Sequence, residues 1–179
     1  MAYAKKINSL EDIPEKLRNT PVADLLSYHN LGAPFKQYDK ADLLIGMCMD
    51  NRKQLRIPDK FAYIIRAGGA NLRYSEFKVS YAIAIGGVRF IALMGHTQCG
   101  MVNLASRRDS FVEGMVKNAG WTQQRALEHF QNFAPLFEID NEIHFTLAEA
   151  QRLNQKYPGV TTIPLLFKVE DNLIYLIEE

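Results

Sequence analysis

Three short apolar runs constrain the fold of this chain more than any other feature. They are Leu43 to Cys48, Phe61 to Ile65 and Val88 to Met94. Each has the length of a strand and is apolar at almost every position, which is typical of a strand covered on both faces. A helix is predicted over 75–85, with Ser75 as its N-cap and Gly86-Gly87 at its end. The order strand, helix, strand favours a right-handed crossover within a parallel sheet.

The remaining segments predict more helices and two final strands. Helices are expected over 8–19, from Thr20-Pro21 to the residues before Gly32, from a Thr122 cap to about 133, and over 140–156. Strands are expected over 161–169 and 172–177, and the last of them pairs antiparallel at the sheet edge. We therefore expect a single α/β domain over 1–179, with a mostly parallel central sheet flanked by helices and a C-terminal edge strand.

Composition excludes several classes of function. Lysine and arginine number 21 against 20 acidic residues, a balance that argues against a nucleic-acid partner or an anionic membrane surface. The sequence shows no run of about 18 apolar residues and no signal-peptide pattern near its start. Only two cysteines are present, Cys48 and Cys99, which is too few for a disulfide framework. We expect a small-molecule substrate, a cytoplasmic location and free thiols.

Metal-binding side chains follow two of the predicted strands. The first segment is Cys48-Met49-Asp50-Asn51-Arg52, and the second is Gly95-His96-Thr97-Gln98-Cys99-Gly100. Ligands of open parallel α/β sheets bind at the carboxyl ends of the strands, so the two segments are expected to meet. Two thiolates and one imidazole leave the fourth position of a tetrahedral zinc ion open, as catalytic sites do. Gly95 and Gly100 are expected to permit the sharp backbone of the second loop.

The first segment also carries a carboxylate and a guanidinium at alternate positions. In an extended chain Cys48, Asp50 and Arg52 share one side. Asp50 could then accept a hydrogen bond from a metal-bound water, while Arg52 keeps it ionised and oriented through a bidentate pair. Taken alone, each cysteine could be an inert buried thiol and the Asp50–Arg52 pair a structural ion pair. Because Cys48, Asp50 and Arg52 share one side of the extended chain, a metal site is favoured over these separate roles.

These motifs together resemble the signature of the β-class carbonic anhydrases. Cys-x-Asp-x-Arg, the loop Arg66-Ala67-Gly68-Gly69-Ala70 and Gly-His-x-x-Cys-Gly carry the resemblance, which covers roughly residues 40–105. The sequence departs from the family at Asn51, Ala67 and Gln98, where a small residue, asparagine and aspartate are common. None of these departures removes a metal ligand or the Asp–Arg dyad, but they leave pocket shape and substrate preference open.

The resemblance implies a carbonic anhydrase, that is, a carbonate dehydratase and zinc lyase. It would hydrate carbon dioxide reversibly to bicarbonate through a zinc-bound hydroxide that the Asp50–Arg52 dyad orients. Cys48, His96 and Cys99 would hold one zinc ion per chain, while Gly68, Gly69, Tyr63 and Tyr81 would contribute to the substrate pocket. Residues 1–38 would form an N-terminal helical arm that packs on the core or on a partner subunit of a homodimer or higher homo-oligomer.

Several alternatives stay open at this point. The same zinc site could hydrolyse carbonyl sulfide or carbon disulfide, or the chain could be a non-catalytic, zinc-stabilised binding protein. Asp50 could also ligate zinc itself and close the site. Tyr63 and Tyr81 are equally compatible with core packing, and Gly68-Gly69 with a plain turn. A dinucleotide-binding loop is not favoured, because Gly-x-Gly-x-x-Gly entering a helix is not present.

Overall fold

The computed structural model describes residues 2–179 and contains one six-stranded sheet. The strands are β1 (Tyr3–Lys6), β2 (Leu43–Met47), β3 (Ala62–Arg66), β4 (Phe90–His96), β5 (Thr161–Lys168) and β6 (Leu173–Glu178), in the order β1-β6-β5-β4-β2-β3. Strands β3, β2, β4 and β5 run parallel, and β6 and β1 add antiparallel pairs. The predicted mixed sheet with a parallel centre is thus confirmed.

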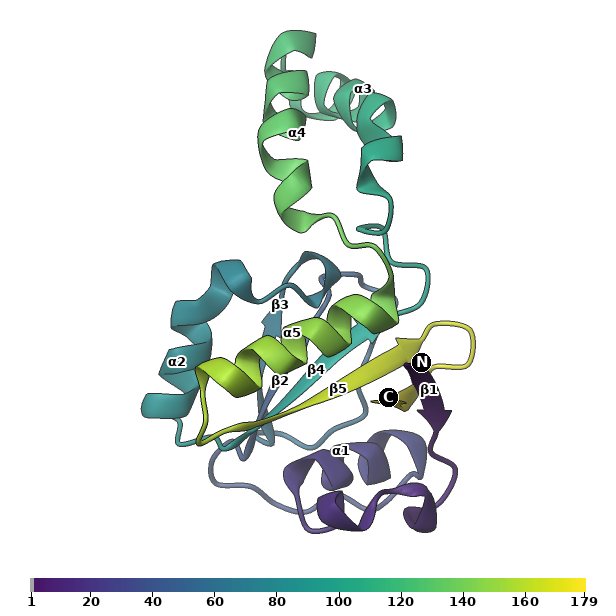
Figure 1. The fold of residues 1–179 in the computed structure, drawn as a ribbon, viewed down its shortest axis with the longest axis vertical. Coiled ribbons are helices and arrows are strands. Elements are labelled where there is room, and N and C mark those ends of the chain that lie inside the picture. Colours follow the sequence, from purple (N-terminus) through teal and green to yellow (C-terminus); the bar gives the residue numbers. More distant parts are fainter. Residues whose placement is uncertain (1) are drawn as a thin grey trace.

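Helices cover both faces of this sheet (Figure 1). They are α1 (Pro21–Asn30), α2 (Glu76–Ala84), α3 (Arg108–Ala119), α4 (Gln123–Phe137) and α5 (Glu142–Lys156). Alternate residues of β2 point to opposite faces: Leu43, Ile45 and Met47 pack with α1, and Leu44 packs with α2 and α5. Strand β2 is therefore buried at every position, which explains its continuous apolar sequence.

Helices α3 and α4 form a hairpin that projects from one end of the sheet (Figure 1). Thr122 caps α4 as predicted, since its hydroxyl accepts a hydrogen bond from the Arg125 amide. The helix runs to Phe137 and so extends past the predicted end near residue 133. Pro135 lies in its last turn, where the loss of one amide donor does not end the helix.

The N-terminal segment differs most from the predicted helices. Residues 8–19 form two short 3₁₀ turns, Leu10–Asp12 and Glu15–Leu17, because Pro14 lies between them and Ile13 before it is extended. Strand β1 was not predicted, and it pairs with β6, Lys5 lying opposite Leu176. The C-terminal strand is therefore antiparallel as expected, but β1 takes the edge position that we assigned to it.

The start of α2 also differs from the prediction in detail. A 3₁₀ turn, Arg73–Ser75, leads into the helix, and the Ser75 side chain makes no capping hydrogen bond. Gly87 follows the helix with φ +73°, a left-handed conformation that favours glycine. The predicted stop is therefore present, whereas the predicted cap is not.

Gly95 is needed for packing rather than for a sharp turn. It lies inside β4, where a Cβ atom would overlap Thr146 Oγ1 of α5 and lie 3.2 Å from the Glu142 carbonyl oxygen. Gly100 has open space around its Cα and no left-handed backbone. The expectation that both glycines bend the loop is wrong. The left-handed residue of that loop is Gln98, with φ 58°.

We predict that Gly95→Ala lowers the free energy of unfolding by roughly 1–3 kcal/mol, because the added methyl group forces β4 away from α5. Urea denaturation measures this loss. Gly100→Ala is the matched control and should stay within about 0.5 kcal/mol of the unsubstituted protein. Thr146→Ala should recover part of the loss when combined with Gly95→Ala, and strictly additive losses would contradict the packing explanation.

Candidate metal centre

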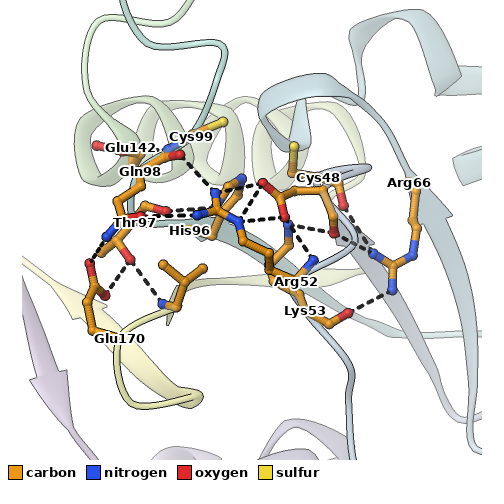
Figure 2. Close-up of polar contacts among 12 residues, drawn as sticks. Cys48, Arg52, Lys53, Arg66, His96, Thr97, Gln98, Cys99, Glu142 and Glu170 are labelled. Carbon is orange, nitrogen blue, oxygen red and sulfur yellow. Dashed lines mark hydrogen bonds and ion pairs between the residues drawn. The ribbon is translucent and has the colours of Figure 1, made fainter.

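Parallel pairing of β2 with β4 brings the two predicted motifs together. Met47 lies opposite Met94, so Cys48, directly after β2, reaches the level of His96 at the end of β4. Cys99 follows three residues later in the same loop. The ligand atoms of Cys48, His96 and Cys99 lie within 4.8 Å of one another, and all three residues are buried. This group could hold a metal ion, and its three residues are labelled in Figure 2.

The His96 ring has the tautomer that a metal ligand needs. Its Nδ1 atom lies 2.8 Å from the carbonyl oxygen of Thr97. A carbonyl oxygen can only accept, so Nδ1 carries a proton, and in the neutral ring the lone pair is then on Nε2. Nε2 is buried and has no hydrogen-bond partner among the described residues. A buried acceptor of this kind fits a metal ion that completes its coordination.

The two sulfurs are arranged to lose their protons to a cation. A hydrogen bond between them lowers the pKa of Cys48 and raises the pKa of Cys99. The backbone amides of Asp50 and Gly69 also lower the pKa of Cys48. One thiol of the pair is thus easier to deprotonate than the other, and a divalent cation that binds both sulfurs would displace the protons that remain. Two thiolates and one imidazole are a donor set that zinc accepts, with a fourth position left for water.

Asp50 and Arg52 form a bidentate ion pair beside this group. Arg52 Nη2 lies 2.8 Å from Asp50 Oδ2, and Arg52 Nε lies 3.1 Å from Asp50 Oδ1. The Arg52 amide also donates to Asp50 Oδ1 at 2.9 Å. The guanidinium holds the pKa of Asp50 well below its usual range. Asp50 is thus an ionised acceptor of fixed orientation.

Two further cations hold the segment that carries these residues. Arg66 Nη1 donates to the carbonyl oxygens of Cys48 and Asp50, each at 3.3 Å, and Nη2 donates to that of Lys53 at 3.2 Å (Figure 2). Lys53 is itself buried, and its Nζ donates to the Asp50 carbonyl oxygen at 3.2 Å. Burial lowers the pKa of Lys53. Lys53 was not among the predicted site residues; its charge, directly after the Cys-x-Asp-x-Arg motif, was the available signal.

The predicted pocket residues separate into two groups. Gly68 and Gly69 lie beside the cluster, Gly69 with φ +64° and its amide directed at Cys48. Tyr63 and Tyr81 are not brought to the cluster. They line a different hollow of about 300 Å³ between β3 and α2, and Tyr63 packs against Gly86. Tyr63 stays partly exposed because β3 is an edge strand with only β2 as a neighbour.

An apolar hollow of about 310 Å³ begins next to the cluster. Met101 packs against Cys48 and Cys99 and also lines the hollow, together with Met49 and Gly68. The opposite wall comes from α4 and includes Phe130, Phe133 and Phe137. This space was not predicted, because it depends on long-range packing of the α3–α4 hairpin against Met49, Gly68 and Met101.

Replacing Lys53 with alanine and with methionine should give different stabilities. Lys53→Ala leaves a cavity and is expected to lower the free energy of unfolding by about 2–4 kcal/mol. Lys53→Met fills the same space, and Arg66 still donates to the Asp50 carbonyl oxygen, so its cost should stay below about 1.5 kcal/mol. Urea denaturation of both variants checks this, and an equally large loss in Lys53→Met would show that the charge itself is indispensable.

Comparison with known proteins gives matches only among solved structures. No protein-family model matches the chain, and no curated protein matches its sequence. A β-carbonic anhydrase from Trichomonas vaginalis is 19% identical with a TM-score of 0.62, and 96% of this chain and 99% of that one are covered. A carbonic anhydrase from Glaciozyma antarctica is 17% identical with a TM-score of 0.61, covering 90% and 98%.

A carbon disulfide hydrolase in its apo form is also similar, at 17% identity and a TM-score of 0.54, with 93% of this chain and 90% of that chain covered. The structural similarity establishes the fold, but at identities this low the activity has to be argued from the residues of the site. The resemblance that the three motifs predicted is therefore confirmed for the fold. The chain has the fold of the β-carbonic anhydrases.

Proposed function

We propose that this protein is a zinc-dependent carbonic anhydrase that hydrates carbon dioxide reversibly to bicarbonate. One observation carries the proposal: a buried Cys48–His96–Cys99 group with a free imidazole lone pair lies beside an ionised, bidentate Asp50–Arg52 pair. A purely structural zinc site closes all four positions with protein ligands and has no use for such a pair. The fold, which this chain shares with carbonic anhydrases, supports the same proposal.

Cys48, His96 and Cys99 would hold one zinc ion per chain. Zinc, when bound, supplies Lewis acidity and makes a water molecule nucleophilic near neutral pH. The Thr97 carbonyl fixes the orientation of the His96 ring through Nδ1, and the Gly69 amide stabilises the Cys48 thiolate.

Asp50 would act as the acceptor that orients the attacking oxygen. Its carboxylate is kept ionised by Arg52, so it can accept a hydrogen bond but cannot donate one. Both carboxylate oxygens are held by the guanidinium, which directs the carboxylate and limits its rotation. The apolar hollow at Met49, Gly68 and Met101 suits a small uncharged substrate that sheds little hydration on entry.

A homodimer or higher homo-oligomer is part of the same proposal. Large apolar side chains are exposed together on β3 and α2, namely Tyr63, Ile64, Phe77, Tyr81 and Ile85. A patch of this kind on an edge strand is a common protein interface. It would also give Tyr63 and Tyr81 a role outside the metal centre.

We propose a cytoplasmic location because both cysteines are free, as a reducing compartment would keep them. Over residues 2–179, the structure contains no helix with the length and apolar character needed to cross a membrane.

Stopped-flow assays should show zinc-dependent hydration of carbon dioxide that is faster at pH 9 than at pH 7. Two thiolate ligands place more negative charge on the ion than imidazoles do, so deprotonation of the reacting water is expected to require higher pH. Removal of the metal by a chelator should abolish the rate, and added zinc should restore it. The same rate at both pH values, or a rate unaffected by the chelator, would contradict the proposal.

Asp50→Asn should lower kcat by about 100-fold while one zinc ion per chain is retained, because the amide keeps the shape but loses the ionised acceptor. Metal analysis and stopped-flow kinetics measure both quantities. Asp109→Asn is the control, since Asp109 is exposed on α3 and pairs with its neighbour Arg108, away from the metal centre. A normal kcat in Asp50→Asn would remove Asp50 from the mechanism.

A second candidate is hydrolysis of carbon disulfide or carbonyl sulfide at the same site. The similarity to a carbon disulfide hydrolase and the apolar lining of the hollow favour it. Release of hydrogen sulfide, measured beside carbon dioxide hydration, distinguishes the two substrates. Zinc binding without turnover of either substrate would instead support a zinc-stabilised binding protein.

A further inference from the structure

Gln98 links the Asp50–Arg52 pair to the turn between β5 and β6. Its side-chain Oε1 accepts a hydrogen bond from Arg52 Nη1 at 3.0 Å, and its backbone oxygen accepts one from Arg52 Nη2 at 3.1 Å. Its Nε2 donates to Glu170 Oε1 at 2.9 Å. Gln98 thus stands between a guanidinium and a carboxylate, and Figure 2 shows the chain of contacts.

The amide of Gln98 satisfies both of its neighbours. The Arg52 guanidinium has only hydrogen-bond donors, so the group that faces it must be an acceptor. The ionised Glu170 carboxylate has only acceptors, so the group that faces it must be a donor. A carboxylate at position 98 would accept from Arg52 but direct a second negative charge at Glu170. The departure at Gln98, where aspartate is common among proteins with this signature, is therefore explained by Glu170.

Glu170 is itself held in place by the loop that carries His96. Thr97 Oγ1 donates to Glu170 Oε2 at 2.7 Å and accepts from the Val169 amide at 3.0 Å. The hydrogen bond from Thr97 lowers the pKa of Glu170, so the carboxylate stays ionised. Glu170 lies in the turn between β5 and β6, and β5 pairs with β4 as far as His96. We call the contacts of Gln98 with Arg52 and Glu170 the Gln98–Glu170 bridge; Gln98 and Glu170 each lie just beyond one of the paired strands β4 and β5.

We propose that Gln98 and Glu170 are positioning residues that hold Arg52 against Asp50, an inference that rests on the proposed function. Arg52 is half exposed, and ion pairs in such places add little to global stability. Their effect lies in geometry: with Arg52 held by groups other than Asp50, the carboxylate keeps its partner and its direction. Rotation of the Asp50 carboxylate toward the metal, where it would become a fourth ligand, is then disfavoured.

A reciprocal exchange tests the bridge. Gln98→Glu sets two carboxylates against each other, whereas the double variant with Glu170→Gln restores one amide and one carboxylate with the positions reversed. The Arg52 Nε–H signal, assigned by its loss in Arg52→Lys, is followed by ¹⁵N NMR hydrogen exchange in the purified protein. Its exchange should become roughly threefold to fivefold faster in Gln98→Glu and return to within about twofold in the double variant.

The Arg152 Nε–H serves as the internal reference, because it donates to the buried Glu149 far from the bridge and should not change. For carbon dioxide hydration, Gln98→Glu should lower kcat with little change in KM, and the double variant should recover kcat. Unchanged Arg52 exchange in Gln98→Glu, or no recovery in the double variant, overturns the inference.

The exchange measurement needs no turnover and separates this inference from the proposed function. If the unsubstituted protein turns over carbon dioxide and Arg52 exchange does not respond, the positioning role alone is wrong. If Arg52 exchange responds as expected but no turnover is found, the bridge is supported and the carbonic anhydrase proposal fails.

Discussion

The parallel pairing of β2 with β4 is the constraint on which the rest of this structure depends. It sets Met47 opposite Met94, and the residues just beyond both strand ends meet at one edge of the sheet. Cys48 and His96 are 48 positions apart in the chain, yet their ligand atoms lie within 4.8 Å. The close approach of α5 to Gly95 supports β4 from one face and Met94 packs toward α1 on the other. The register of β2 against β4 therefore brings the metal-binding residues together.

Charge compensation is the second organising feature of the site. The two buried cysteines and the partly buried, ionised Asp50 carboxylate lie close together, and unpaired charge in such a place is costly. Arg52, Arg66 and Lys53 surround them, and the last two bind backbone carbonyls of the 48–53 segment. The same cations that offset the charge therefore also hold the backbone that positions the ligands.

Much of the fold and the site could be predicted because the signals are local. Continuous apolar runs predicted the central strands, and the position of Cys48 and His96 at strand ends predicted that they would meet. Strand β1 was missed because Tyr-Ala-Lys-Lys has no apolar pattern and forms a strand only through its pairing with β6. The helix expected over 8–19 failed at Pro14, where the lack of an amide hydrogen overrode a helical composition.

Features that depend on long-range packing could not be read from the sequence. Tyr63 and Tyr81 were assigned to the pocket by resemblance, but within this chain they line a separate hollow between β3 and α2. Lys53 and the Gln98–Glu170 bridge depend on contacts between segments distant in the chain, such as the turn after β5 and the loop after β4. The apolar hollow likewise exists only because α4 lies across the loops.

Zinc K-edge X-ray absorption of the purified, zinc-loaded protein tests the central claim most directly. We expect two sulfur ligands at about 2.3 Å, one imidazole nitrogen at about 2.0 Å and one further oxygen at a similar distance. That set would show a Cys48–His96–Cys99 centre whose fourth ligand is an oxygen atom rather than a further sulfur or imidazole. A shell with fewer than two sulfurs, or one without imidazole scattering, would contradict the account.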